Sequence, residues 1–324
     1  MIYLHCKSDM EEINNIKKNK KRLPWVVWYI VIIAIAQYIL INYKDTISFV
    51  DANIFILLGA PGSVEIYNGQ YWGVLTNNFL HIYLSQLVLN IIGVSIFGYI
   101  IEKRIGFIRF SFIIVLASIV PSIIQLNLTN QPGIGLSSVN FTLFGYILIK
   151  GFQDKDFRIK YVQLFLAIMI GVIVYCQIYN LYFEDVYRTE AMTFGFLLGL
   201  FIGYLSKFKI WIQSIVLFNI IAFCISSLFY APWSSEWQLY KGVSAHKAKQ
   251  YKNAKKYYKK SLDINPKNQQ SINNINLLKI DELKWKAYKA HVKEQYKLAR
   301  KLYEEILDID PTDEWAIEGY NELP

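Results

Sequence analysis

Apolar residues are concentrated in the middle of the chain, in stretches separated by short polar segments. A helix that crosses the hydrocarbon core of a bilayer needs roughly 20 residues. Seven stretches approach that length, some of them marginally: about 25–43, 84–101, 107–126, 134–150, 160–180, 189–206 and 210–230. Pro24 precedes the first stretch and Pro232 follows the last, as is typical of helix boundaries. The pattern therefore predicts an all-α protein with a polytopic bundle of membrane helices.

Polar, lysine-rich segments flank this apolar middle part at both ends of the chain. We predict a basic tail over 1–24, a membrane core over 25–206, a seventh transmembrane helix over 207–232 and a soluble helical domain over 233–324. Residues 44–83 are half apolar but interrupted by proline, glycine and aspartate. We expect a structured loop there, with short helices in the membrane interface.

The charge distribution predicts an orientation. The chain is 54% hydrophobic and 18% charged, with a mean hydropathy of +0.26 and a net charge of +9. Lysine and arginine are concentrated in the tail and after the second, fourth and sixth apolar stretches. By the positive-inside rule the N-terminus is cytoplasmic, and after seven crossings the C-terminal domain lies outside the cytoplasm. Membrane topology thus accounts for the basic charge, and no motif indicates nucleic-acid binding.

The C-terminal region contains an internal repeat. QYKNAKKYYKKSLDINP (250–266) matches QYKLARKLYEEILDIDP (295–311) with an offset of 45 residues. Small residues recur where helices would cross, tyrosines fill the groove, and prolines end the units: Gly242, Ala254, Ala287, Ala299, Tyr258, Tyr303, Pro266 and Pro311. This spacing resembles the tetratricopeptide repeat (TPR), whose period is about 34 residues, so an insertion of roughly eleven residues is expected around 267–280. Such arrays bind peptides or partner helices, and the alternative is a passive spacer.

Four segments of the membrane part carry a second resemblance. In chain order they are YWGVLTNNFLHIYLSQLVLN (71–90), GYIIEKRIG (98–106), GLSSVNFTLFG (135–145) and EAMTFGFLLGLFIG (190–203). Together they resemble the rhomboid intramembrane serine proteases over about 25–206. The resemblance implies a six-helix core, to which a seventh helix and a TPR domain are added in some members of the family.

The resemblance implies a role for several polar residues. Ser137 occupies the position of the nucleophile, and Gly135 precedes it in the GLSS motif. Asn90 occupies the position that helps bind the oxyanion, and Gln86 stands where the family has an oxyanion histidine. In EKRIG, Glu102 can accept hydrogen bonds from backbone N–H groups of the following loop, while Gly106 permits the turn.

The sequence departs from the family at the catalytic base. Rhomboids place a histidine on the sixth helix, ahead of two glycines, and here that position is Met192, followed by Gly195 and Gly199. A thioether does not take a proton from serine at neutral pH, and an unactivated serine is a weak nucleophile. His81, at the mouth of the second helix, is the first alternative base to consider.

Three hypotheses follow for the function. The first is a rhomboid pseudoprotease that binds transmembrane segments or membrane-protein clients, with the TPR domain as a second contact for a peptide or protein. The alternative is an active intramembrane serine endopeptidase that uses Ser137 with a non-standard base. The third is an unrelated polytopic transporter or scaffold, which predicts an unbroken fourth helix. No cofactor is implied, and no histidine or cysteine cluster has the spacing of metal ligands. We expect an integral protein of a bacterial plasma membrane, in contact with the lipid bilayer.

Overall fold

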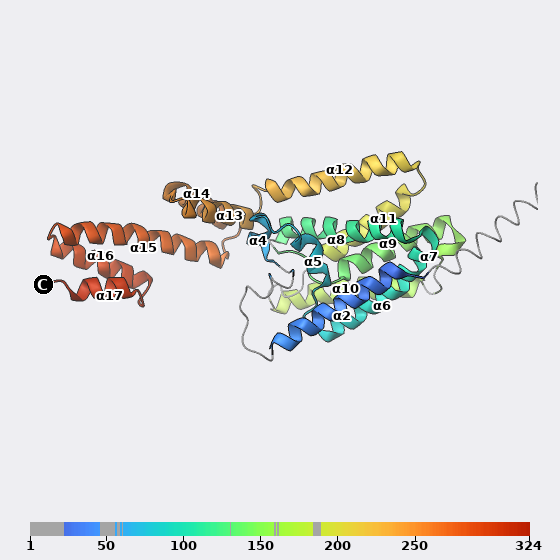
Figure 1. Cartoon of the computed structure of the whole chain (residues 1–324), viewed down its shortest axis with the longest axis horizontal. Helices are drawn as coiled ribbons and strands as arrows, with labels where there is room; N and C mark the ends of the chain where they lie inside the picture. Colours follow the sequence, from blue (N-terminus) through green and yellow to red (C-terminus); the bar gives the residue numbers. More distant parts are fainter. Residues whose placement is uncertain are drawn as a thin grey trace, which may run out of the picture. The chain divides into compact units, whose positions relative to one another are not determined.

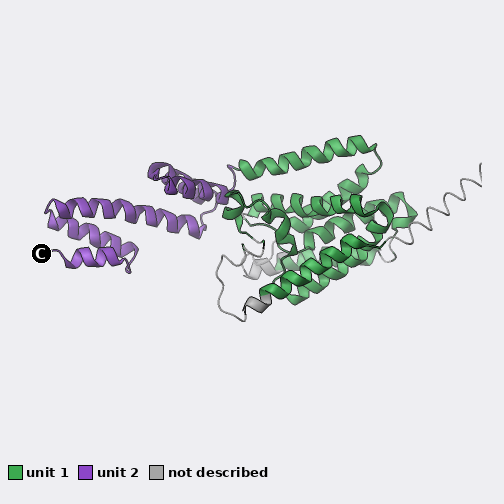
Figure 2. Ribbon diagram, viewed as in Figure 1, with its two compact units in different colours: residues 1–231 green, residues 232–324 purple. Residues whose placement is uncertain are grey.

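A computed structural model describes residues 23–45, 56, 59, 61–129, 131–158, 160, 162–183 and 189–324. The tail predicted over 1–24 lies almost wholly outside these residues, as does much of the first half of the loop over 44–83. The chain divides into two compact units, residues 1–231 and 232–324 (Figure 2). The described elements are all helical.

Each predicted apolar stretch forms a helix in the first unit (Figure 1). The long helices are α2 (Trp25–Asp45), α6 (Leu84–Gly93) continued through η2 (Val94–Gly98) into α7 (Tyr99–Ile105), α8 (Phe107–Thr129), α9 (Ser137–Gln153), α10 (Val162–Phe183), α11 (Glu190–Leu205) and α12 (Ile210–Phe229). Short helices α4 (Ser63–Tyr67), α5 (Gly73–Thr76) and η1 (Asn77–Phe79) form part of the predicted structured loop, and η3 (Lys155–Phe157) follows α9.

Length and apolar composition separate these helices into two groups. Among the described residues, three helical stretches are long and apolar enough to cross a membrane: Leu84–Ile105, Phe107–Thr129 and Ile210–Phe229. Shorter apolar helices cover Trp25–Ile41, Val162–Cys176 and Glu190–Leu205. Helix α9 is in neither group because its first turns carry serine, asparagine and threonine, although all residues from Ser138 to Ile147 are buried.

Close backbone contact joins α9 to α11. A Cβ atom added to Gly195 would lie 2.5 Å from the carbonyl oxygen of Ser138, and one added to Gly199 would lie 2.0 Å from that of Thr142. From the other helix, a Cβ on Gly145 would lie 2.4 Å from the carbonyl oxygen of Phe196. Distances this short leave no room for any side chain. Gly145, Gly195 and Gly199 therefore let the fourth membrane helix pack closely on the sixth.

The Glu102 carboxylate has a different partner from the one expected. Its two oxygens accept hydrogen bonds from the backbone N–H groups of Val26 and Val27, each at 3.0 Å. These groups belong to the first turn of α2, which has no earlier carbonyls to bond, and not to the loop that follows Glu102. The negative carboxylate also lies at the positive end of the dipole of α2, which is a favourable interaction. Gly106 adopts φ +83°, as the turn requires.

The second unit consists of α13 (Ser235–Lys247), α14 (Tyr251–Ile264), α15 (Gln269–Val292), α16 (Tyr296–Ile309) and α17 (Glu314–Asn321). The predicted small residues Ala254, Ala287 and Ala299 are fully buried. A Cβ on Gly242 would lie 2.4 Å from the ring of Tyr258, which is itself buried. The predicted packing of small residues against tyrosine is therefore present in the structure.

The two copies of the repeat share further details. His246 contacts the Tyr258 hydroxyl at 3.4 Å, and His291 contacts the Tyr303 hydroxyl at 3.0 Å. The insertion expected around 267–280 takes a helical form. Helix α15 has 24 residues and α13 has 13, so the first helix of the second copy is longer at its N-terminal end.

Candidate functional site

The start of α9 is a break in helical structure. Residues 131–136 are not helical, and α9 begins at Ser137. Gly135 adopts φ +85°, a conformation that L-residues rarely take, and its N–H donates to the carbonyl oxygen of Asn77 at 3.0 Å. Ser137 is thus held at the N-terminus of a helix, where backbone N–H groups are free to face a ligand. An unbroken fourth helix, as the third hypothesis predicts, is not what the structure has.

Asn90, on α6, is the hydrogen-bonding centre of the site. Its Oδ1 accepts from the Ser137 hydroxyl at 3.3 Å and from Asn140 Nδ2 at 2.9 Å. The same Nδ2 also donates to the backbone carbonyl of Asn90 at 3.0 Å. Asn140 is one of the polar residues of this apolar stretch, but no role was predicted for it. Its spacing of three residues from Ser137 was the available signal, because it places both side chains near one face of a helix.

His81 is buried and its protonation state is set by its neighbours. Its Nε2 lies 3.3 Å from the backbone N of Leu136 and 3.1 Å from Asn90 Nδ2. A backbone N–H can only donate, so Nε2 is the acceptor and the proton is on Nδ1. Nδ1 lies 2.9 Å from the carbonyl oxygen of Phe79, which accepts that proton. The basic nitrogen of His81 is therefore already engaged by two donors.

Gln86 lies against the glycine that precedes Ser137. A Cβ atom on Gly135 would lie 2.8 Å from Gln86 Nε2. The amide is thus beside the loop that leads into α9, and a side chain on residue 135 would displace it. His81, Gln86, Asn90, Gly135 and Ser137 come from two segments of the chain and are brought together here.

Met192 lies in the first turn of α11. The residue three positions later, Gly195, packs on the carbonyl oxygen of Ser138, so Met192 lies within one turn of this contact along α11. The backbone N–H of Ala191 donates to Gln125 Oε1, on α8, at 3.0 Å, which fixes this end of α11. Met192 is partly exposed, and its sulfur offers at most a weak hydrogen-bond acceptor.

A second polar cluster, between α9, η1 and α8, was not predicted from the sequence. Ser138 donates to Asn78 Oδ1 at 3.0 Å, and Asn78 Nδ2 donates to Ser122 Oγ at 3.1 Å. All three side chains are buried. Ser118, Ser122 and Gln125 recur at helical spacing along the otherwise apolar α8, and that pattern was the signal for this cluster.

The arrangement can bind a polar group but shows no means of activating the serine. Over the described part of the chain, the Ser137 hydroxyl has an amide oxygen as its hydrogen-bond acceptor, and no imidazole or carboxylate bonds to it. An amide oxygen does not accept a proton at neutral pH. The described residues also contain no group of three or more His, Cys, Asp or Glu side chains that could hold a metal ion.

Comparisons with known proteins agree with both resemblances. Residues 68–213 match the model of the Rhomboid domain, and residues 241–268 match that of a tetratricopeptide repeat. The Rhomboid protease GlpG of Klebsiella pneumoniae is 28% identical over 129 residues, which cover 40% of this chain and 45% of that protein. The protein of the same name from Salmonella choleraesuis is 25% identical over 137 residues, covering 42% of this chain and 48% of the relative.

The chain thus aligns with a little under half the length of these curated relatives. The matched region nevertheless includes each of the site residues, from His81 to Met192. The chain therefore contains a Rhomboid domain, which is followed by a tetratricopeptide repeat.

Proposed function

We propose that this protein is a pseudoprotease of the rhomboid family, which binds transmembrane segments of client proteins without cutting them. The feature that carries the proposal is Met192, which stands where the resemblance predicts the base, in a chain whose residues Ser137, Asn90 and His81 are joined by hydrogen bonds. Serine proteolysis requires a base within hydrogen-bonding reach of the hydroxyl. Loss of such a base costs several orders of magnitude in rate.

The packing of α10 supports a role in binding membrane helices. Of the residues on the side of α10 that faces the bundle, Cys176 is buried, whereas Phe165, Met169 and Ile173 remain partly exposed. Phe165 contacts the ring of Phe97 with centroids 5.7 Å apart. A loosely packed apolar helix leaves surface that another apolar helix can cover, since association within a membrane depends on side-chain packing.

The repeat unit would supply a second contact with the client. Two copies of a helical hairpin give a surface typical of peptide and protein binding. With a cytoplasmic N-terminus and seven crossings, this unit would lie outside the cytoplasm of a bacterial cell and meet the extracytoplasmic part of the client.

The test uses a tagged fluorophosphonate, which reacts covalently with an activated serine. Membranes with the unmodified protein, the Ser137→Ala variant and the Met192→His variant are treated in parallel. The proposal expects no labelling of the unmodified protein and Ser137-dependent labelling of Met192→His. Labelling of the unmodified protein that disappears in Ser137→Ala would overturn it.

An active protease with His81 as its base is the second candidate. Its support is the chain of hydrogen bonds from Ser137 through Asn90 to His81. Against it stands the engagement of Nε2 by two donors. If purified protein cleaves a membrane substrate in a Ser137-dependent way, His81→Gln should abolish cleavage. His81→Asn is the control for stability, and the two variants should have similar thermal unfolding midpoints. Unchanged cleavage in His81→Gln would eliminate His81 as the base.

A further inference from the structure

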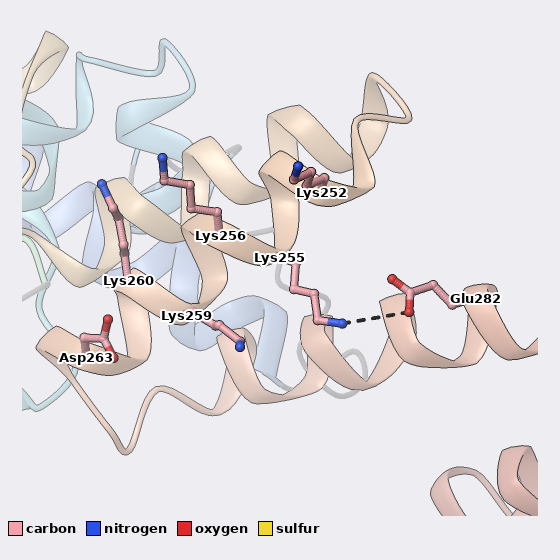
Figure 3. Close-up of a pocket in the computed structure, with 7 residues that line it drawn as sticks. All are labelled: Lys252, Lys255, Lys256, Lys259, Lys260, Asp263 and Glu282. Carbon is pink, nitrogen blue, oxygen red and sulfur yellow. Dashed lines mark ion pairs between the residues drawn. The ribbon is translucent and has the colours of Figure 1, made fainter.

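One face of α14 carries an unusual concentration of positive charge. Lys252, Lys255, Lys256, Lys259 and Lys260 line a shallow hollow together with Asp263 and with Glu282 of α15 (Figure 3). One ion pair is formed in this group, between Lys255 and Glu282 at 3.8 Å. In Figure 3 the side chains of Lys252, Lys256 and Lys260 extend along one side of the helix, away from Glu282. Lysines spaced by three and four residues repel one another.

The fold of the repeat does not require this charge. The equivalent helix of the second copy, α16, has Lys297, Arg300 and Lys301 in its first half but Glu304 and Glu305 where α14 has Lys259 and Lys260. Opposite charges four residues apart stabilise a helix, whereas like charges destabilise it. Both helices nevertheless have 14 residues and the same buried alanine and tyrosine. The lysine face of α14 therefore points to an external partner of negative charge.

The position of α14 along the chain favours a membrane as that partner. Five residues, 230–234, separate the end of α12 from the start of α13. Five residues span at most about 17 Å. In the last turn of α14, Ser261 is hydrogen-bonded to Ser235, the first residue of α13, with 2.9 Å between their hydroxyl oxygens. The end of α14 that carries Lys259 and Lys260 is thus connected to α12 through the first residue of α13 and a five-residue linker.

We propose that the lysine face of α14, formed by Lys252, Lys255, Lys256, Lys259 and Lys260, binds the anionic lipid headgroups of the leaflet from which α12 emerges. Basic side chains beside a membrane helix are attracted to anionic lipid, and the attraction decays within about 10 Å at 0.1 M salt. An acidic protein segment would need no tether to the bilayer, so the tether favours lipid. The inference does not depend on whether Ser137 cleaves anything.

The full-length protein in nanodiscs provides the test. One preparation contains only phosphatidylcholine, and the other contains about one third phosphatidylglycerol. An amine-reactive reagent modifies exposed lysines, and mass spectrometry gives the rate at each position. We expect Lys252, Lys256 and Lys260 to react several-fold more slowly in the anionic discs. Lys297 and Lys301 on α16 are the internal control and should react equally in both, and 0.5 M NaCl should abolish the difference.

A paired variant separates charge from folding. Lys259→Glu with Lys260→Glu gives α14 the charge pattern of α16 and creates favourable pairs with Lys255 and Lys256, so the helix should remain folded. Each lysine near an anionic surface contributes roughly a five-fold change in affinity, so the affinity for the anionic surface should fall at least about ten-fold and the protection of Lys252 and Lys256 should be lost. Equal reaction rates in neutral and anionic discs would overturn the proposal. Protection that appears in neutral discs only when poly-glutamate is added would overturn it in favour of an acidic protein partner.

Discussion

Two kinds of contact hold the first turns of α9. Polar side chains of other elements form hydrogen bonds with its serines, whereas α11 packs on its backbone through glycines. Ser137 is held by Asn90, and Ser138 by Asn78. On the α11 side, Gly195 and Gly199 press against carbonyl oxygens of α9. The contact therefore does not depend on which side chain residue 192 carries. This difference explains how the fold can stay assembled with methionine at residue 192, where the resemblance predicts the base histidine.

The largest effect should come from a substitution that blocks the close contact between the backbones of α9 and α11. Gly199→Ala would place a Cβ 2.0 Å from the carbonyl oxygen of Thr142, and backbone on both sides cannot move aside. We expect a loss of about 3 kcal/mol or more, at the upper end of the cost of overpacking, measured as a fall in the thermal unfolding midpoint in detergent. Gly171→Ala, on α10, is the control because nothing lies within 4 Å of its added Cβ. Equal effects of the two substitutions would contradict the close contact.

On the α9 side, the largest effect should come from Asn90→Ala. The substitution removes the acceptor of the Ser137 hydroxyl, one acceptor of Asn140 and the partner of His81 Nε2. Buried polar groups that lose a partner cost about 1–3 kcal/mol. The same denaturation measurement should show a loss in this range, whereas Asn219→Ala, on the exposed part of α12, should have little effect. A neutral Asn90→Ala would mean that the network does not stabilise the fold.

The stability of the first unit should also depend on pH through His81, which precedes the apolar helix that begins at Leu84. Burial lowers the pKa of His81, and the hydrogen bond to the Phe79 carbonyl opposes this only in part. The unfolded chain therefore takes up a proton near pH 6.5 while the folded chain resists it, so stability is complete above that pH and decreases below it. Unfolding midpoints of the unmodified protein and of His81→Asn, compared at pH 8 and pH 5.5, should show a smaller acid loss in the variant.

The smallest effect should come from Met192→Leu. Leucine has nearly the volume of methionine, so the substitution should change stability by less than about 1.5 kcal/mol and should leave client binding unchanged. Crosslinking of a client transmembrane segment in membranes gives the binding measurement, with Met192→Trp as a variant that adds bulk in the first turn of α11. A large effect of leucine would mean that the thioether itself has a role.

Hydrophobic patterning predicted the helices of the first unit because each long apolar stretch is a local property of the chain. The partners of polar residues were harder to predict. Glu102 bonds to Val26 and Val27, which lie far upstream, and no local signal connects them. The partners of Asn78, Asn140 and Gln125 were not predicted, because single polar residues within apolar helices reveal their partners only once the helices pack. The resemblance to a known family supplied the role of Ser137, which spacing alone could not give.

The length of the insertion in α15 determines which side of the helix faces α16. Its 24 residues exceed the 13 of α13 by eleven. At 3.6 residues per turn, eleven residues complete about three full turns, or slightly more, and move the chain about 16 Å along the axis. The C-terminal half of α15 therefore keeps the angular setting it would have without the insertion, and Ala287 and Ala290 still meet α16. An insertion of nine residues would rotate that half by about half a turn and present the exposed side chains of Trp285, Tyr288 and Val292 to α16 instead of the small alanines, so only certain lengths preserve the second copy of the repeat.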